Sequence, residues 1–179
     1  NLAIGYQAMT ADTAGGTQNI AIGNYALDAL TSGDKNTAVG YLALSTNTSS
    51  ENNTAVGADA LLTCNGSNNT GIGTNALKLS TTGTQNVAVG HNALTANTTA
   101  SQNTAVGQES LKANTTGTAN VAVGAEALKA NTTADNNTAV GMNSLLANTT
   151  GASNTGLGSH ALVANTTGGS NIAVGIKKE

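Results

Sequence analysis

The sequence predicts an all-β fold, a parallel β-solenoid built from about ten coils of 17 residues. The string N-x-[AG]-[VIL]-G recurs eleven times, at intervals of 16 to 18 residues, from Asn1 to Asn171. Each unit places β-branched residues directly after the Asn, and such residues favour a pleated strand. Each unit is also shorter than the helical-hairpin repeats, which need about thirty residues or more. One unit therefore corresponds to one coil.

Places in each unit are numbered from its Asn, so that the consensus reads N-T-A-V-G-x-x-A-L-x-A-N-T-T-G-x-x. We expect a short strand just after the Asn, as at 37–39 and 121–123. Coils stacked at the inter-strand spacing of about 4.8 Å would form a rod of roughly 50 Å. The repeat fills the chain without a linker or capping element, which predicts that residues 1–179 are a single solenoid domain excised from a longer fibre.

Two places carry the only substantial hydrophobic rows. Place 4 is aliphatic in every copy, from Ile4 to Val174, and place 9 is Leu in every full coil except the first, which has Met9. One or both rows must be buried, and the sequence does not show which row faces another chain. Places 3 and 8 hold only Ala, Gly or Ser, which implies close approach of another backbone, across a thin coil or from a neighbouring chain.

Two further places are explained by the stacking of coils. Place 5 is Gly in all eleven copies, from Gly5 to Gly175, as a corner with positive φ would require. The leading Asn also recurs in every copy, and amide side chains stacked at strand spacing can hydrogen-bond from coil to coil in a ladder.

The composition excludes several classes of function. Charged residues are 8% of the chain, aromatic residues 2%, and the net charge is −3, which gives no basic footprint for nucleic acid. The apolar runs are only a few residues long, so no membrane insertion is expected in this segment. A single cysteine, Cys64, excludes an internal disulfide framework, and we interpret it as a small residue substituted into a turn.

No group of residues predicts catalysis. His91 and His160 lie four coils apart, too far to share a metal, and we interpret both as solvated surface residues. Catalysis needs a nucleophile, a base and an orienting group within reach of one another, and no such set is found. We therefore expect no enzyme activity, no catalytic residue, no cofactor and no bound metal.

One pair of carboxylates repeats on successive coils. Glu109 and Glu126 share place 7, with Lys112 and Lys129 at place 10. Stacked carboxylates could attract calcium, but the G-G-x-G-x-D motif of calcium-binding solenoids is absent. We interpret the two acids as a solvated surface pair relieved by the lysines.

The N-T-T rows at places 12–14 have three interpretations. N-x-T is a glycosylation acceptor. Asn and Thr can also satisfy a turn through side-chain-to-backbone bonds, which is the favoured interpretation. A regular array of hydroxyls and methyls could instead bind ice or another surface, with Asn and the second Thr sharing the outward face. The residues of this candidate surface row are Asn97, Thr99, Asn114, Thr116, Asn131, Thr133, Asn148, Thr150, Asn165 and Thr167.

The stretches Asn36–Ala43 and Asn103–Ser110 resemble the N-S-V-A-I-G-x-x-S head repeat of YadA-type trimeric autotransporter adhesins. They are also similar to the N-T-A-I-G-x-x-A-L repeats of bacterial and phage tail-fibre-like proteins. The resemblance implies a left-handed β-roll, an intertwined homotrimer and a role as a stalk or adhesive head outside a cell or virion. The repeat departs from the adhesin head, whose unit is about 14 residues, by adding N-T-T-G.

Taken alone, each coil buries little apolar area for the conformational entropy that it loses, which favours association, most simply of three chains. We expect a non-enzymatic segment of a surface fibre, acting as a stalk or as an adhesive head for a host surface, matrix or glycan. Two alternatives stay open: a solenoid that binds ice or another surface through the N-T-T face, and a subunit that assembles end to end into filaments.

Overall fold

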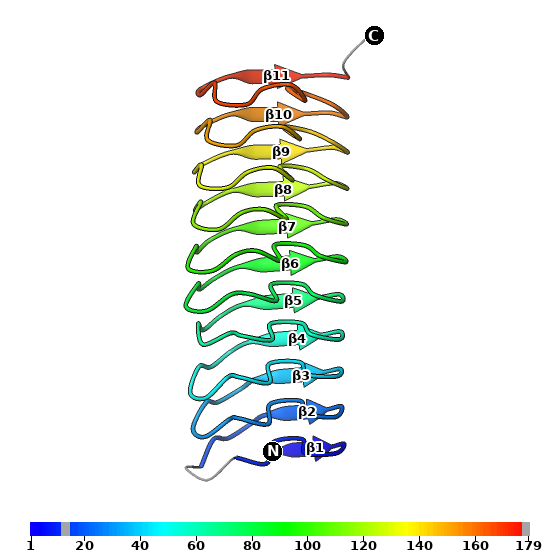
Figure 1. The fold of residues 1–179 in the computed structure, drawn as a ribbon, viewed down its shortest axis with the longest axis vertical. Helices are drawn as coiled ribbons and strands as arrows, with labels where there is room; N and C mark the ends of the chain where they lie inside the picture. The colour runs from blue at the N-terminus through cyan, green and yellow to red at the C-terminus, as the bar shows by residue number, and fades with distance from the viewer. Residues whose placement is uncertain (12–14, 177–179) are drawn as a thin grey trace.

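The computed structural model describes residues 1–11 and 15–176, and it confirms the predicted solenoid (Figure 1). Within these residues, eleven three-residue strands form one parallel sheet in which each strand pairs with the next along the chain. The register is uniform, with Ala38 opposite Ala55 and Ala105 opposite Ala122. The strands are β1 (Leu2–Ile4), β2 (Ile20–Ile22), β3 (Thr37–Val39), β4 (Thr54–Val56), β5 (Thr70–Ile72), β6 (Val87–Val89), β7 (Thr104–Val106), β8 (Val121–Val123), β9 (Thr138–Val140), β10 (Thr155–Leu157) and β11 (Ile172–Val174).

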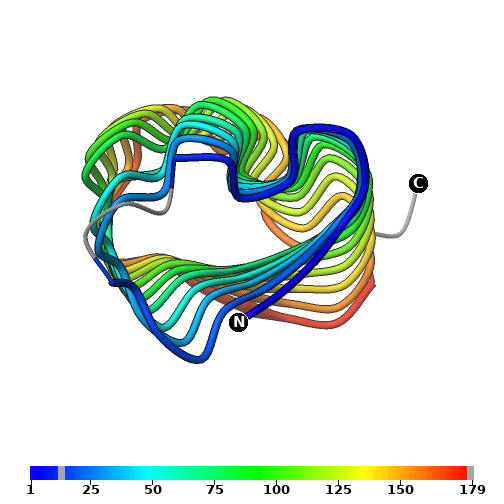
Figure 2. The ribbon, with the colours of Figure 1, turned by 90° about the horizontal axis from the view of Figure 1, so that it is seen from below.

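Outside the strands, the coil is a series of turns that stack as regularly as the sheet. Leu94 N–H donates to the Ser110 carbonyl at 3.0 Å and Thr98 N–H to the Thr115 carbonyl at 3.1 Å, both on the next coil. Seen from the N-terminal end, the chain runs counterclockwise as it recedes from the viewer, so the solenoid is left-handed (Figure 2). Coils are therefore joined all round their circumference, and not only through the sheet.

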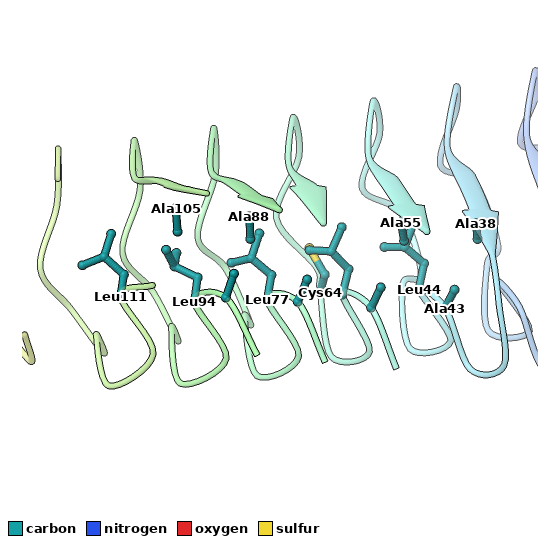
Figure 3. Close-up of a cluster of buried hydrophobic side chains, with 14 of the residues drawn as sticks. Ala38, Ala43, Leu44, Ala55, Cys64, Leu77, Ala88, Leu94, Ala105 and Leu111 are labelled. Carbon is teal, nitrogen blue, oxygen red and sulfur yellow. The ribbon is translucent and has the colours of Figure 1, made fainter. Parts of the chain in front are cut away.

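The core shows which of the two hydrophobic rows is buried. The Leu row at place 9 is buried, and it packs inside the coil with the small residues of places 3 and 8, as Leu44 does with Ala38 and Ala43 (Figure 3). The fit is tight, because a Cβ added at Gly71 would lie 3.1 Å from Leu61 Cγ. Small residues at place 3 thus reflect close approach across a thin coil, and place 4 is left pointing outward.

The Gly at place 5 has two reasons to be glycine. Gly107 has φ +131°, and a Cβ there would lie 2.5 Å from the Gly124 carbonyl oxygen of the next coil. Other corners adopt positive φ without glycine, at places 7, 9 and 17. Leu111 at place 9 has φ +49°, a conformation rare for a bulky side chain, and its complete burial offsets that strain.

The leading Asn forms the expected ladder, and it does so inside the coil. Asn103 is fully buried, and its Oδ1 accepts the backbone N–H of Asn120 at 3.0 Å. Its Nδ2 donates to the Gly117 carbonyl at 2.9 Å within the same coil. Each such side chain therefore ties one coil to the next and closes its own coil.

Candidate functional site

The N-T-T rows do not present the surface that strand alternation predicts. Asn97, Asn114, Asn131 and Asn148 are fully buried and Asn165 is partly buried, so the asparagine half of the predicted row is wrong as a binding surface. The physical reason is that places 12–14 form a turn, where the alternation of a strand does not apply. The second threonine remains exposed, giving a single rank: Thr99, Thr116, Thr133, Thr150 and Thr167.

The buried asparagines of place 12 form a second ladder. Asn114 Nδ2 donates to Asn97 Oδ1 at 3.1 Å on the preceding coil and to the Gly117 carbonyl at 2.9 Å. The first threonine also bonds to the backbone, since Thr98 Oγ1 donates to the Thr115 carbonyl at 3.1 Å. These contacts support the turn interpretation, and they leave no exposed asparagine amide at Asn97 or Asn114 to carry a glycan.

Cys64 and Ser80 interrupt this second ladder. Both stand at place 12 and both are buried. Burial raises the pKa of the Cys64 thiol to about 11, against weaker lowering by hydrogen bonds with Gly66 and Asn69, so the thiol is protonated at neutral pH. A buried, protonated thiol is a poor nucleophile and a poor metal ligand.

The two histidines lie at the outer corner of the coil. His91 is exposed, and His160 is half-buried, with Nδ1 at 2.8 Å from Ser159 Oγ and Nε2 at 3.1 Å from Asn143 Nδ2. Within residues 1–11 and 15–176, no three His, Cys, Asp or Glu side chains lie close enough together to hold a metal ion. Over the same residues, no helix has the length and apolar character needed to cross a bilayer.

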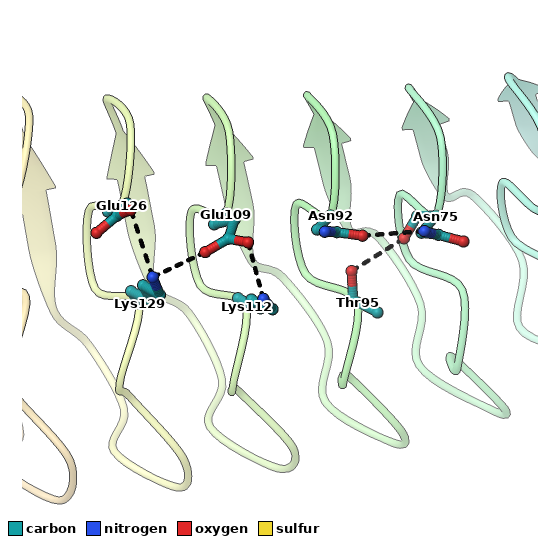
Figure 4. Close-up of polar contacts among 7 residues, drawn as sticks. All are labelled: Asn75, Asn92, Thr95, Glu109, Lys112, Glu126 and Lys129. Carbon is teal, nitrogen blue, oxygen red and sulfur yellow. Dashed lines mark hydrogen bonds and ion pairs between the residues drawn. The ribbon is translucent and has the colours of Figure 1, made fainter.

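The stacked carboxylates are paired with the lysines, as the sequence predicts (Figure 4). Glu109 accepts from Lys112 and Lys129 at 2.8 Å each, and Lys129 also lies 3.3 Å from Glu126. The two lysines lower the pKa of Glu109 to about 2, and Glu109 in turn raises that of Lys129. All four charges are thus used within the cluster.

A shallow groove of about 650 Å³ runs beside this cluster. Its floor is built from the small residues of place 11, Ala96, Ala113, Ala130 and Ala147, and its lip includes Lys112, Glu126, Lys129 and Leu146. The charged groups on the lip are already paired with one another. The groove therefore offers an apolar surface without a free group that would select a ligand.

The outer face of the sheet is a feature that the sequence alone did not assign. Places 2 and 4 flank the buried residue of place 3 and point outward together, as in Val121 and Val123. Exposure at place 4 reaches 36% at Val123 and 39% at Val140. Neither place holds a charged residue in any coil. We call this two-rank strip of β-branched and aliphatic residues the sheet face.

A signal for the sheet face was present in the sequence. Strand alternation around a small residue at place 3 requires places 2 and 4 to share the opposite side. In comparisons with known proteins, no family model matches the chain, no curated protein matches it and no solved structure matches it. Its function is therefore inferred from the geometry described above.

Proposed function

We propose that the chain is a segment of a structural or adhesive surface fibre, outside a cell or virion, that associates as a homotrimer and performs no catalysis. The observation that carries the proposal is the sheet face. It is uncharged and regular, and its outward residues are half-buried to exposed along the eleven strands, and extended apolar strips on soluble proteins mark association surfaces. The role as a fibre rests on this face together with the resemblance to trimeric adhesin and tail-fibre repeats.

The position of the core supports the choice of face. The Leu row is buried inside the coils, so it cannot contribute to contacts between chains. Val89, Val106 and Val123 belong to the remaining aliphatic row, and they project from the outer side of the parallel sheet. Three copies that turn this face inward would bury the row along the whole rod and would leave the polar turns in water.

The sheet face also favours a second candidate function, the binding of ice or another ordered surface. Thr104 and Val106, with their equivalents on every coil, form two ranks at regular spacing, whereas the exposed Thr99 and Thr116 form only one. A flat array of methyls and hydroxyls in register is the feature that an ice-binding surface requires. This second role needs an uncovered face, so the two candidates predict different association states.

Charge placed on the sheet face tests the proposal. The triple variant Val89→Lys, Val106→Lys and Val123→Lys should lower the mass in sedimentation from three chains to one, while circular dichroism keeps its β signal, because like charges repel at the centre of an assembly. The matched control, with Thr99, Thr116 and Thr133 changed to Lys, places the same charge on the exposed threonine rank and should keep the parental mass. A sheet-face variant with unchanged mass would contradict the proposal.

A further inference from the structure

The three aromatic side chains of the chain lie together at one corner of the first three coils. The sequence has three Tyr, no Trp and no Phe. The ring centroids of Tyr6 and Tyr25 are 5.6 Å apart at an interplanar angle of 84°, and those of Tyr25 and Tyr41 are 6.2 Å apart at 86°. The rings thus form a continuous edge-to-face row along the rod axis, which we call the tyrosine row.

Two of the three rings of the tyrosine row face solvent, and Tyr25 between them is half-buried. Tyr6 is 63% exposed and Tyr41 is 53% exposed. Later coils carry His91 or Met142 at place 6, where Tyr6 and Tyr41 stand, so the corner forms without an aromatic residue. Tyr25 stands at place 7, and its φ of +59° is the conformation that this place also adopts at Leu42 and Glu109, so the backbone there does not depend on the ring. The benefit of the three rings therefore lies outside the coil.

Neutral amides accompany the rings. Asn24 is exposed and accepts the Tyr6 N–H on its Oδ1 at 3.1 Å, while its Nδ2 has no hydrogen-bond partner among the described residues. Gln7, beside Tyr6, is also exposed. Places 6 and 7 of the first three coils hold no charged residue. Aromatic faces with amide donors and acceptors and no charge suit a neutral polyhydroxyl ligand better than an ionic one.

The spacing of the row selects an extended ligand. Tyr6 and Tyr41 share place 6 on the first and third coils, so they lie about 10 Å apart along the axis, at twice the strand spacing of about 4.8 Å. This distance is close to the length of one disaccharide in an extended β-1,4-linked polysaccharide. Alternate sugar rings of such a chain can pack on Tyr6 and Tyr41, with the edge of Tyr25 between them.

We infer that the tyrosine row is a binding site for an extended β-linked polysaccharide that lies parallel to the solenoid axis. The inference gives a ligand class to the adhesive role proposed above, and it rests on that role but not on the association of three chains.

Intrinsic fluorescence gives a direct test, because the three tyrosines of the row are the only aromatic residues in the chain. Titration with cellohexaose and with chitohexaose should give a saturable change in tyrosine fluorescence for at least one of them. Tyr41→Ala should raise the dissociation constant about tenfold or more, the loss typical of an aromatic anchor, and Tyr6→Ala should do the same. Met142→Ala, at the same place on the ninth coil and 51% exposed in the parent, is the matched control and should leave binding unchanged.

Three results would overturn the inference. The first is the absence of any fluorescence response to either hexasaccharide at millimolar concentration, and the second is a response to hexalysine alone. The third is a fall in assembled mass for Tyr41→Ala, which would make the row a contact between copies. The mass of the unmodified chain separates this inference from the proposed trimer. A monomer that still binds a hexasaccharide would refute the trimer and leave the polysaccharide site in place.

Discussion

Asn103 and Asn114 donate their side-chain amides to the same acceptor, the carbonyl oxygen of Gly117, each at 2.9 Å. The first belongs to the ladder of place 1 and the second to the ladder of place 12, so one backbone oxygen links both ladders within a single coil. The link recurs on other coils, as at Ala134, which accepts from Asn120 at 2.8 Å and Asn131 at 3.1 Å. A chain with little apolar area thus obtains much of its order from buried amides.

Asn114→Ala should lower the free energy of unfolding by about 1–3 kcal/mol, because it breaks two bonds of the ladder. It removes the amide that donates to Asn97 Oδ1, and it removes the Oδ1 atom that accepts from Asn131 Nδ2 at 2.9 Å in the parent. Urea unfolding followed by circular dichroism measures the change. Thr116→Ala, on the exposed rank, is the control and should stay within about 0.5 kcal/mol of the parent. Equal stability of the two variants would show that the second ladder is not stabilising.

Ser80→Asn should stabilise the chain by about 1 kcal/mol, because it extends the ladder to a place where the serine hydroxyl is buried without a partner. The new Oδ1 would lie opposite Asn97 Nδ2, which has no ladder acceptor on the preceding coil. Ser80→Ala separates the causes, since removing an unpaired hydroxyl should not destabilise the fold. Thermal unfolding of both variants tests this, and a lower melting temperature for Ser80→Asn would refute the ladder extension.

Ala119→Asn should raise the free energy of unfolding by about 0.5–1 kcal/mol. Ala119 stands at place 17 with φ +55°, and asparagine tolerates this left-handed conformation better than alanine does. Ala125→Asn, at place 6, where φ is not positive, provides the comparison and should bring no gain. Denaturant midpoints of the two variants measure the difference, and equal midpoints would contradict the prediction.

Glu109 should make stability depend on pH in acid. The pKa of its carboxyl is lowered from 4.5 to about 2 by the hydrogen bonds from Lys112 and Lys129. A carboxylate with a lowered pKa in the folded state stabilises the fold fully above its ordinary pKa, and this stabilisation is lost as the pH falls from about 4.5 to about 2. Glu109→Gln should therefore flatten the dependence of unfolding free energy on pH in that window. The same slope in parent and variant would exclude the pairing as its cause.

The period of the repeat was enough to predict the solenoid, its parallel in-register sheet and the glycine corner, because each follows from stacking identical places. The period did not predict which aliphatic row points into the coil and which points outward. Val123 is more apolar than Ala122, so hydrophobicity alone would place Val123 inside, yet Leu128 already fills the thin coil and leaves room only for alanine at place 3. Volume, and not hydrophobicity, decided which side of the strand is buried.

The candidate surface row failed in part for a related reason. Asn131 is polar and precedes two threonines, which favours an exposed assignment, yet stacking gives its amide partners on Asn114 and on Ala134 inside the coil. The positive φ of Leu128 also has no signal in a sequence, because leucine rarely adopts it. The burial of Asn131 and the positive φ of Leu128 both depend on contacts with neighbouring coils, and the sequence of a single unit does not contain these contacts.

The absolute mass of the unmodified chain in solution, measured by light scattering after size exclusion, tests the central claim most directly. A stable mass of three chains is expected, with the sheet face at their contacts. A clean monomer would contradict it, would leave that face uncovered, and would move the binding of ice or another ordered surface ahead as the function.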